Sequence, residues 1–252
     1  MGVVEGAGTL RLPQLRTMVF PIGDDHINGR YKPIVSYTLI IFNVLCYVWQ
    51  NTDPSGELHV AEFGCVPAEI SRGREIHTLF SGMFMHGGFM HLLGNMMFLW
   101  VFGDNIEAVV GNVRFLLFYL FGGLMASAAQ ILLNMDSLVP CVGASGAIAA
   151  VMGAYMVMYP KSRILMLFVL NFSRFHLPAL AFLGFWIVQQ LLSGIGALPF
   201  FGGNGVDGGG VAYWAHIGGF AAGIACGFLF RPGALRAQEA PGPEWPIWER
   251  YS

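Results

Sequence analysis

Six long apolar stretches restrict most strongly how this chain can fold. A helix needs about 20 apolar residues to cross a bilayer, because each residue rises about 1.5 Å and the hydrocarbon core is about 30 Å thick. The stretches that reach or approach this length are residues 34–49, 89–102, 113–134, 138–159, 177–197 and 211–230. We therefore predict an all-α membrane protein whose six transmembrane helices form one bundle.

The composition agrees with a bilayer as the solvent. Of the 252 residues, 55% are hydrophobic and 11% are charged, whereas soluble domains carry about 25% charged residues. A net charge of −2 supplies no basic face, so we expect no nucleic-acid partner. A shorter apolar segment, residues 164–170, has basic residues on both sides and is predicted to be a surface connection.

The segments outside the bundle divide the chain into three regions. Residues 1–17 are rich in glycine and lack the apolar core of a signal peptide, so residues 1–33 are predicted to be a cytoplasmic N-terminal segment. Residues 34–230 form the helical domain, and residues 231–252 form a cytoplasmic tail. The cysteines contain no C-x-x-C pair, which indicates neither a zinc cluster nor a disulfide framework. They are Cys46, Cys65, Cys141 and Cys226.

The distribution of basic residues predicts the orientation in the membrane. With six spans, both ends of the chain lie on one side, and eleven of the thirteen Lys and Arg residues fall on that side. The other two are Arg72 and Arg74. By the positive-inside rule, both termini are cytoplasmic and residues 51–77 and 202–210 face outward. We expect a multi-pass protein of a plasma or inner membrane.

Two reactive side chains lie near the outer starts of the fourth and sixth spans. Ser145 is in the sequence GASG, residues 143–146, and His216 is in WAHIGG, residues 214–219. If each helix begins five or six residues earlier, both side chains lie roughly 8–10 Å below the outer surface. Their matching depths allow the two to meet.

Small residues provide a way for these two spans to approach each other. In the sixth span, His216 lies at the head of a stripe of glycines with the helical period, Gly219, Gly223 and Gly227. In the fourth span the stripe is Ser145, Ala149 and Gly153, flanked by Gly146 and Ala150. Such stripes let membrane helices touch backbone to backbone, although they also pack helices that have no catalytic role. We predict that the stripes bring Ser145 and His216 within hydrogen-bond distance.

A serine beside a histidine predicts acyl-transfer chemistry. A serine hydroxyl becomes a strong nucleophile when a base takes its proton, and neutral imidazole suits that task near neutral pH. No carboxylate lies inside a predicted span, and the nearest are Asp104, Glu107 and Asp136. We therefore expect a dyad of Ser145 as nucleophile and His216 as general base, without an acidic third member.

Donors for an oxyanion are also available. His91 and Asn95 lie at i and i+4 on one face of the second span, and the backbone N–H of Ser145 is at a helix start. The alternative for the two side chains is an interhelical hydrogen bond. His86 is predicted to bond the outer loop to the bundle. Like His86, three glycines are predicted to have supporting roles in the site: Gly143, Gly146 and Gly219.

Other membrane chemistries lack the residues that they need. An aspartyl protease requires two buried aspartates, and none lies in a span; a zinc protease requires a pattern such as H-E-x-x-H, and none of the seven histidines precedes a glutamate. We expect neither a metal nor another cofactor. A small transporter or channel would favour charges or repeated half-structures inside the spans, which are absent from the sequence.

The chain resembles the rhomboid family of intramembrane serine proteases in its basic six-helix form, over roughly residues 63–230. The resemblance rests on three motifs in order: FMHGGFMHLLGN at 84–95, VGASGA at 142–147 and AHIGG at 215–219. It implies the same dyad and the same oxyanion donors. It also implies that the outer connection before the second span is a membrane-embedded first loop and that the glycine-rich residues 202–210 belong to a loop capping the site.

The resemblance further implies an activity and its partners. The expected reaction is hydrolysis, through an acyl-enzyme, of a peptide bond in or beside the transmembrane segment of a single-span protein. A small residue precedes the scissile bond, and the partners are such substrates and the lipid bilayer; the sequence does not define an oligomeric state. The alternative is a catalytically silent rhomboid-like protein that escorts membrane clients, and such proteins typically lack the serine or the histidine.

Two positions depart from the family pattern. Many members carry a Trp-Arg pair in the first loop, where residues 76–79 here are Ile-His-Thr-Leu. Some members place a tyrosine four residues after the nucleophile, where it stacks on the catalytic histidine, whereas this chain has Ala149. Other neighbours must therefore brace the loop and orient His216.

Overall fold

The fold was obtained as a computed structural model that describes residues 19–25, 32–52, 58–197 and 211–239. Predictions for the remaining segments, among them the capping stretch 202–210, lie outside these residues. The elements in chain order are β1 (Val19–Asp24), α1 (Ile34–Gln50), α2 (Leu58–Phe63), α3 (Pro67–Ser71), α4 (Thr78–Ser81), η2 (Gly82–Phe84), α5 (Phe89–Val110), α6 (Asn112–Leu133), α7 (Ser145–Met158), β2 (Arg163–Phe168), β3 (Ser173–Pro178), α8 (Ala179–Ala197) and α9 (Tyr213–Glu239).

Apolar helices make up most of the described chain. Among the described residues, three helices are long and apolar enough to cross a membrane, and they lie in α6, α8 and α9. Two shorter apolar helices, α1 and α7, have 17 and 14 residues. The fifth helix, α5, has 22 residues but carries Asp104 and Glu107 in its C-terminal part. These helices indicate a multi-pass membrane protein.

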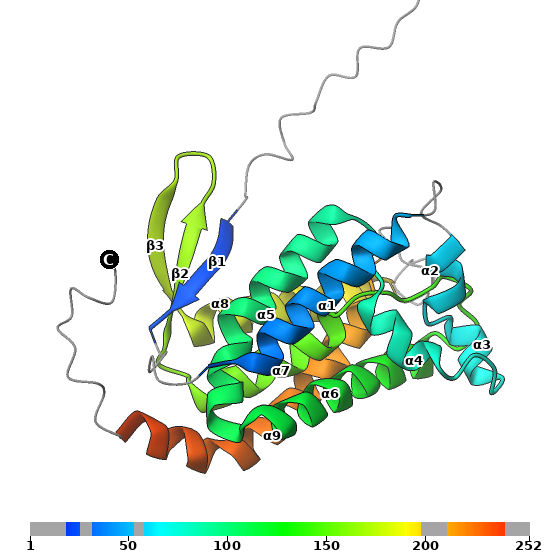
Figure 1. The fold of residues 1–252 in the computed structure, drawn as a ribbon. Coiled ribbons are helices and arrows are strands. Elements are labelled where there is room, and N and C mark those ends of the chain that lie inside the picture. Colours follow the sequence, from blue (N-terminus) through cyan, green and yellow to red (C-terminus); the bar gives the residue numbers. More distant parts are fainter. Residues whose placement is uncertain (1–18, 26–31, 53–57, 198–210, 240–252) are drawn as a thin grey trace, which may run out of the picture.

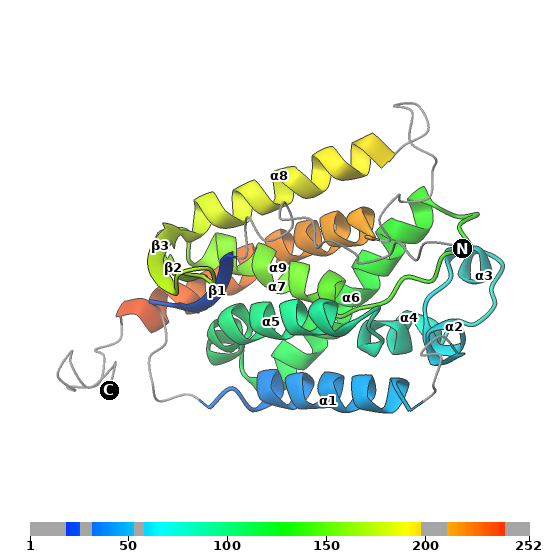
Figure 2. The ribbon, with the colours of Figure 1, turned by 90° about the horizontal axis from the view of Figure 1, so that it is seen from above.

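Helix α7 is the centre of the bundle (Figure 2). Residues 146–155 of this helix are all buried, because α5, α6, α8 and α9 all pack against it. Figure 2 shows α1 and α8 at opposite edges, and large apolar side chains of both are exposed, including Val48 and Phe185. An apolar surface of this kind is compatible with lipid and not with water.

The backbones of α7 and α9 touch directly. A Cβ added at Gly219 would lie 2.1 Å from the carbonyl oxygen of Gly146, and one at Gly223 would lie 1.9 Å from that of Ala150. Gly153 is equally close to the backbone of α9. The contact therefore uses the glycine stripe expected on α9, whereas on α7 it runs along the flanking residues Gly146 and Ala150 and meets the predicted stripe at Gly153.

The fourth predicted span begins later than the sequence suggested. Residues 138–144 are not helical, and α7 begins at Ser145. Proline at 140 removes a backbone donor, and Gly143 has a φ of +121°, a conformation that L side chains rarely adopt. The depth predicted for Ser145 along its helix is therefore wrong, because the serine is the first residue of α7.

A small antiparallel sheet occupies the predicted surface connection. Strand β2 pairs with β1 on one side and β3 on the other. Figure 1 shows the sheet at one end of the bundle, with α2, α3 and α4 at the other. The side chains of Ile164 and Met166 are buried, which is the period-2 pattern of a half-buried strand. Helix α9 continues to Glu239, so helical structure extends past the boundary predicted at residue 230.

Acidic residues tie the sheet end of the bundle together. The Glu107 carboxylate accepts hydrogen bonds of 2.8 Å from the backbone N–H groups of Val35 and Ser36, and a third of 2.7 Å from Ser36 Oγ. It thereby caps the N-terminus of α1, where backbone donors lack helical partners. Asp24 on β1 accepts hydrogen bonds from the Asn105 amide and the Tyr155 hydroxyl. These carboxylates therefore hold structural positions.

The contact between α7 and α9 predicts a sharp effect of adding one methyl group. Gly223→Ala places a Cβ against a backbone oxygen that cannot rotate away, so we expect a loss of stability of about 1–3 kcal/mol. The midpoint of thermal unfolding in detergent measures this loss. Gly184→Ala on α8 is the matched control, since a Cβ there meets nothing within 4 Å. Equal midpoints for both variants would contradict the close contact.

Candidate functional site

The serine and histidine singled out in the sequence lie together at the end of the bundle that carries α2, α3 and α4. Ser145 Oγ lies 2.8 Å from His216 Nε2, a hydrogen-bond distance. Ser145 is the first residue of α7, and His216 is in the first turn of α9. Both side chains are half-buried. Gly146 and Gly219, which were assigned supporting roles, contact each other directly beneath the pair. The helix contact thus sets the separation of the two side chains.

A third residue, which the sequence analysis missed, contacts the histidine from α8. Gln190 Oε1 lies 2.7 Å from His216 Nδ1, and the Trp186 ring centre lies 5.6 Å from that of His216. Gln190 is buried, whereas its neighbour Gln189 is exposed. The sequence places Gln190 on one helix face with Leu183 and Trp186, which precede it by seven and four residues, but only the structure shows that this face is turned inward.

The hydrogen bonds of His216 define its tautomer. An amide oxygen can only accept, so the bond to Gln190 requires the hydrogen on Nδ1. Nε2 then carries a lone pair directed at the Ser145 hydroxyl. Among the described residues, no hydrogen bond joins a carboxylate to either Ser145 or His216. In this arrangement the imidazole can accept the serine proton.

The predicted oxyanion donors converge on Gly143. A Cβ at this glycine would lie 2.8 Å from His91 Nε2 and 3.4 Å from Asn95 Nδ2, so only hydrogen fits between them and the backbone. Asn95 is buried and its Nδ2 has no hydrogen-bond partner among the described residues, while His91 is exposed. The N–H groups of residues 145–147, at the start of α7, precede the first intrahelical hydrogen bond, which Ile148 donates to the Ala144 oxygen. All these donors lie at the start of α7.

Backbone pairing braces the first loop against the segment before α7. Cys65 and Cys141 exchange two backbone hydrogen bonds of 3.1 and 2.8 Å, without a disulfide. The Gly143 N–H donates to the Gly82 oxygen at 2.9 Å. The loop and the turn that precedes Ser145 are therefore one hydrogen-bonded unit.

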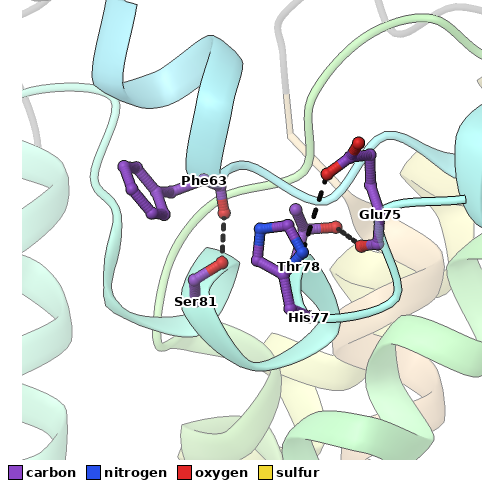
Figure 3. Close-up of polar contacts among 5 residues, drawn as sticks. All are labelled: Phe63, Glu75, His77, Thr78 and Ser81. Atoms are coloured by element: carbon purple, nitrogen blue, oxygen red, sulfur yellow. Dashed lines mark hydrogen bonds and ion pairs between the residues drawn. The ribbon is translucent and has the colours of Figure 1, made fainter.

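Polar contacts brace the part of the first loop around residues 75–81, the stretch expected to depart from the family pattern (Figure 3). Ser81 Oγ donates to the Phe63 carbonyl at 2.8 Å, and Thr78 Oγ1 donates to that of Glu75 at 2.7 Å. The His77 ring lies 3.6 Å from the Glu75 carboxylate, an ion pair when the histidine is protonated. The Ser81 hydroxyl thus joins α4 to the end of α2, whereas the contacts of Thr78 and His77 lie within the turn that leads into α4.

His86 joins the loop to the bundle through its backbone. Its N–H and C=O both bond the Gln50 side chain of α1, at 3.0 and 2.6 Å. The imidazole is fully buried, edge to face with His91, and neither ring nitrogen makes a hydrogen bond of normal geometry within the described part. Burial, followed by the charge of His91, lowers the pKa of His86 from 6.5 to about 4. The ring is therefore neutral at physiological pH.

A pocket opens beside Ser145. Its walls come from α4, η2, α6 and the starts of α7 and α9, and they include Thr78, Met83, Ser127 and Gln130. Gln130 is buried, and its Oε1 accepts a hydrogen bond of 3.2 Å from the Ala215 N–H. The pocket therefore adjoins the serine hydroxyl and has a mixed apolar and polar lining.

Comparison with known proteins supplies relatives. A family model described as the Rhomboid domain matches residues 73–233. RHOMBOID-like protein 4 of Arabidopsis thaliana is 32% identical over 181 residues, which cover 69% of this chain and 40% of that protein. Rhomboid protease GluP of Bacillus subtilis (strain 168) is 30% identical over 127 residues, 50% of this chain and 24% of that protein. This chain spans less than two thirds of either relative.

The turn before α7 predicts that Gly143→Ala reduces the reactivity of Ser145. The alanine would be strained at a φ of +121° and would press on the His91 ring, so the donors beside the serine would separate. The rate of labelling by a fluorophosphonate probe is expected to fall by tenfold or more, which corresponds to about 1.4 kcal/mol. Gly94→Ala on α5, where a Cβ meets nothing within 4 Å, serves as the control. A labelling rate that stays at the wild-type level in Gly143→Ala would refute this view of the turn.

The lowered pKa of His86 predicts a pH dependence of stability. The unfolded chain binds a proton near pH 6.5 that the folded chain excludes until about pH 4, so the free energy of unfolding falls as the pH falls through this window. His86→Asn is expected to flatten this part of the pH profile of stability. Ser173→Ala, which removes no titratable group at an exposed position on β3, is expected to keep the wild-type slope. Identical slopes in the wild type and His86→Asn would disprove that His86 causes this pH dependence of stability.

Proposed function

Because this chain belongs to the rhomboid family, we propose that it is an intramembrane serine endopeptidase that cleaves transmembrane segments of single-span membrane proteins. The observation that carries the proposal is the 2.8 Å contact between the Ser145 hydroxyl and His216 Nε2 at the starts of two central helices. A hydroxyl and an imidazole in this relation form the minimal unit of nucleophilic acyl transfer. Their accessibility beside an open pocket supports a reaction with a peptide.

The reaction follows from the arrangement of donors and acceptors. Ser145 Oγ attacks the scissile carbonyl carbon while its proton passes to His216 Nε2, and the carbonyl oxygen becomes an oxyanion. The N–H groups of Asn95, His91 and the Ser145 backbone stabilise that charge, and each well-placed donor contributes about 3–4 kcal/mol. The protonated His216 then donates to the leaving amine. Water, deprotonated by the same imidazole, hydrolyses the acyl-enzyme and restores the serine.

The length of α7 supports a site below the membrane surface. Its 14 residues span about 21 Å, which is less than the hydrocarbon core of about 30 Å. If its far end lies near one surface, Ser145 lies within the membrane and not at its edge. Six spans with both termini in the cytoplasm, as the basic residues indicate, would place this site toward the outer side.

The relatives bear on the choice between a protease and a silent escort. The bacterial relative GluP is named as a rhomboid protease, whereas the plant relative is named only as rhomboid-like. A silent family member is expected to lack the serine or the histidine, and this chain has both in hydrogen-bond contact. This contact is the reason to propose the protease, with membrane-spanning proteins as its substrates.

Two substitutions test the proposal directly. Ser145→Ala and His216→Ala are each expected to abolish fluorophosphonate labelling and to lower cleavage of a single-span reporter by about 10³-fold or more, because the two side chains act as one unit. The reporter carries a small residue before the scissile bond, and cleavage is followed by gel in detergent and in proteoliposomes. Ser173→Ala, at an exposed position on β3, is the matched control. Labelling that persists in Ser145→Ala would move the reactive group elsewhere.

A further inference from the structure

We propose that Gln190 is a positioning residue that holds the base of the dyad in its reactive tautomer. The inference rests on the proposed function, since it concerns the same histidine. Gln190 touches neither the serine nor the pocket beside it, and its only described side-chain hydrogen bond is the one of 2.7 Å to His216 Nδ1. It acts on the reaction through His216.

The first argument is the position of the glutamine in its helix. Helix α8 is among the most apolar segments of the chain, and an amide on its inner face must find a partner, because an unpaired buried polar group costs about 1–3 kcal/mol. Gln190 is 6% exposed and faces the bundle. The partner of the amide oxygen is the His216 ring, and the proposed reaction requires this ring to be oriented.

The second argument is that α7 offers nothing for this task. The residue one turn after Ser145 is Ala149, whose methyl group has no acceptor and no ring. Helix α8 supplies both kinds of contact instead: Trp186 packs against the imidazole at 5.6 Å, with the rings inclined by 40°, and Gln190, one turn later, accepts its hydrogen. Three helices therefore contribute one residue each to a Ser–His–Gln arrangement.

The chemistry of an amide gives this arrangement a definite role. When the Ser145 Oγ–H bond breaks and the His216 Nε2–H bond forms, the ring becomes an imidazolium whose Nδ1–H still points at the amide oxygen. The amide gains no proton, so no charge passes beyond the histidine, and the same Nε2 proton later goes to the leaving amine. Gln190 thus keeps Nε2 as the acceptor before the step and stabilises the cation by a dipole after it.

The experiment compares three variants of the full chain with the wild type. Gln190→Leu removes the acceptor at similar volume, Gln190→Glu keeps an acceptor, and Gln189→Leu makes the same change at the adjacent exposed position. Reporter cleavage yields kcat and KM over a range of pH. Selective ¹⁵N labelling of histidine reports the His216 tautomer by NMR, and thermal unfolding reports the fold.

The proposal expects a lower kcat without a change in KM. Gln190→Leu should reduce kcat by roughly tenfold to a hundredfold, since the imidazole then samples both tautomers, while Gln189→Leu stays at the wild-type value. Gln190→Glu should recover most of kcat. It should also shift the acid limb of the pH profile of kcat to higher pH, because a carboxylate stabilises the imidazolium. The wild-type NMR spectrum should show the hydrogen on Nδ1.

Distinct results would overturn this inference and the proposed function. A wild-type kcat in Gln190→Leu, or a wild-type spectrum with the hydrogen on His216 Nε2, would overturn the role of Gln190 alone. Labelling that does not depend on Ser145 would overturn the protease itself. If Gln190→Leu fails to fold, the pH profile of Gln190→Glu and the wild-type tautomer still decide the question, because neither depends on that variant.

Discussion

The direct contact between the backbones of α7 and α9 is the constraint on which the candidate site depends. At Gly219 and Gly223 only hydrogen fits, so carbonyl oxygens of α7 lie against the Cα atoms of α9. Lipid tails are as apolar as leucine, and close van der Waals packing of this kind is a main force that holds membrane helices together. Because α7 begins at Ser145 and His216 lies in the first turn of α9, the same contact that stabilises the bundle sets the distance between the two side chains.

A second constraint acts on the chain just before α7. Gly143 adopts a backbone conformation reserved for glycine, is bonded to Gly82 of the first loop, and lies against the side chains of His91 and Asn95. The turn thus connects the loop, the polar face of α5 and the first residue of α7. The end of the bundle that carries this turn is polar and hydrogen-bonded, whereas the centre of α7 is closely packed and apolar. Such a division allows a rigid scaffold to present reactive groups at its edge.

Several features were open to prediction because they are local patterns in the sequence. Apolar runs located α1, α6 and α8 to within about two residues, and the small-residue spacing on α9 indicated where it packs. The proximity of Ser145 and His216 was predicted as well, although the structure brings it about by a different line of contact on α7 and with Ser145 as the first residue of its helix. Hydrophobic length and helical period are properties of short stretches of chain, so the membrane class and the close approach of the two helices could be predicted from the sequence.

Tertiary structure alone decided the features that depend on distant partners. The sheet formed by β1, β2 and β3 needs a strand from before α1 to pair with a hairpin more than a hundred residues later. The start of α7 depends on bonds between the segment before it and the first loop, which compete with helix formation. Gln190 and Gln189 are the same residue side by side in sequence, and only packing makes one buried and the other exposed. The sequence indicated the apolar solvent, several of the long helices and the proximity of Ser145 and His216; the fold decided how the histidine is held, because orientation requires contacts that no single segment contains.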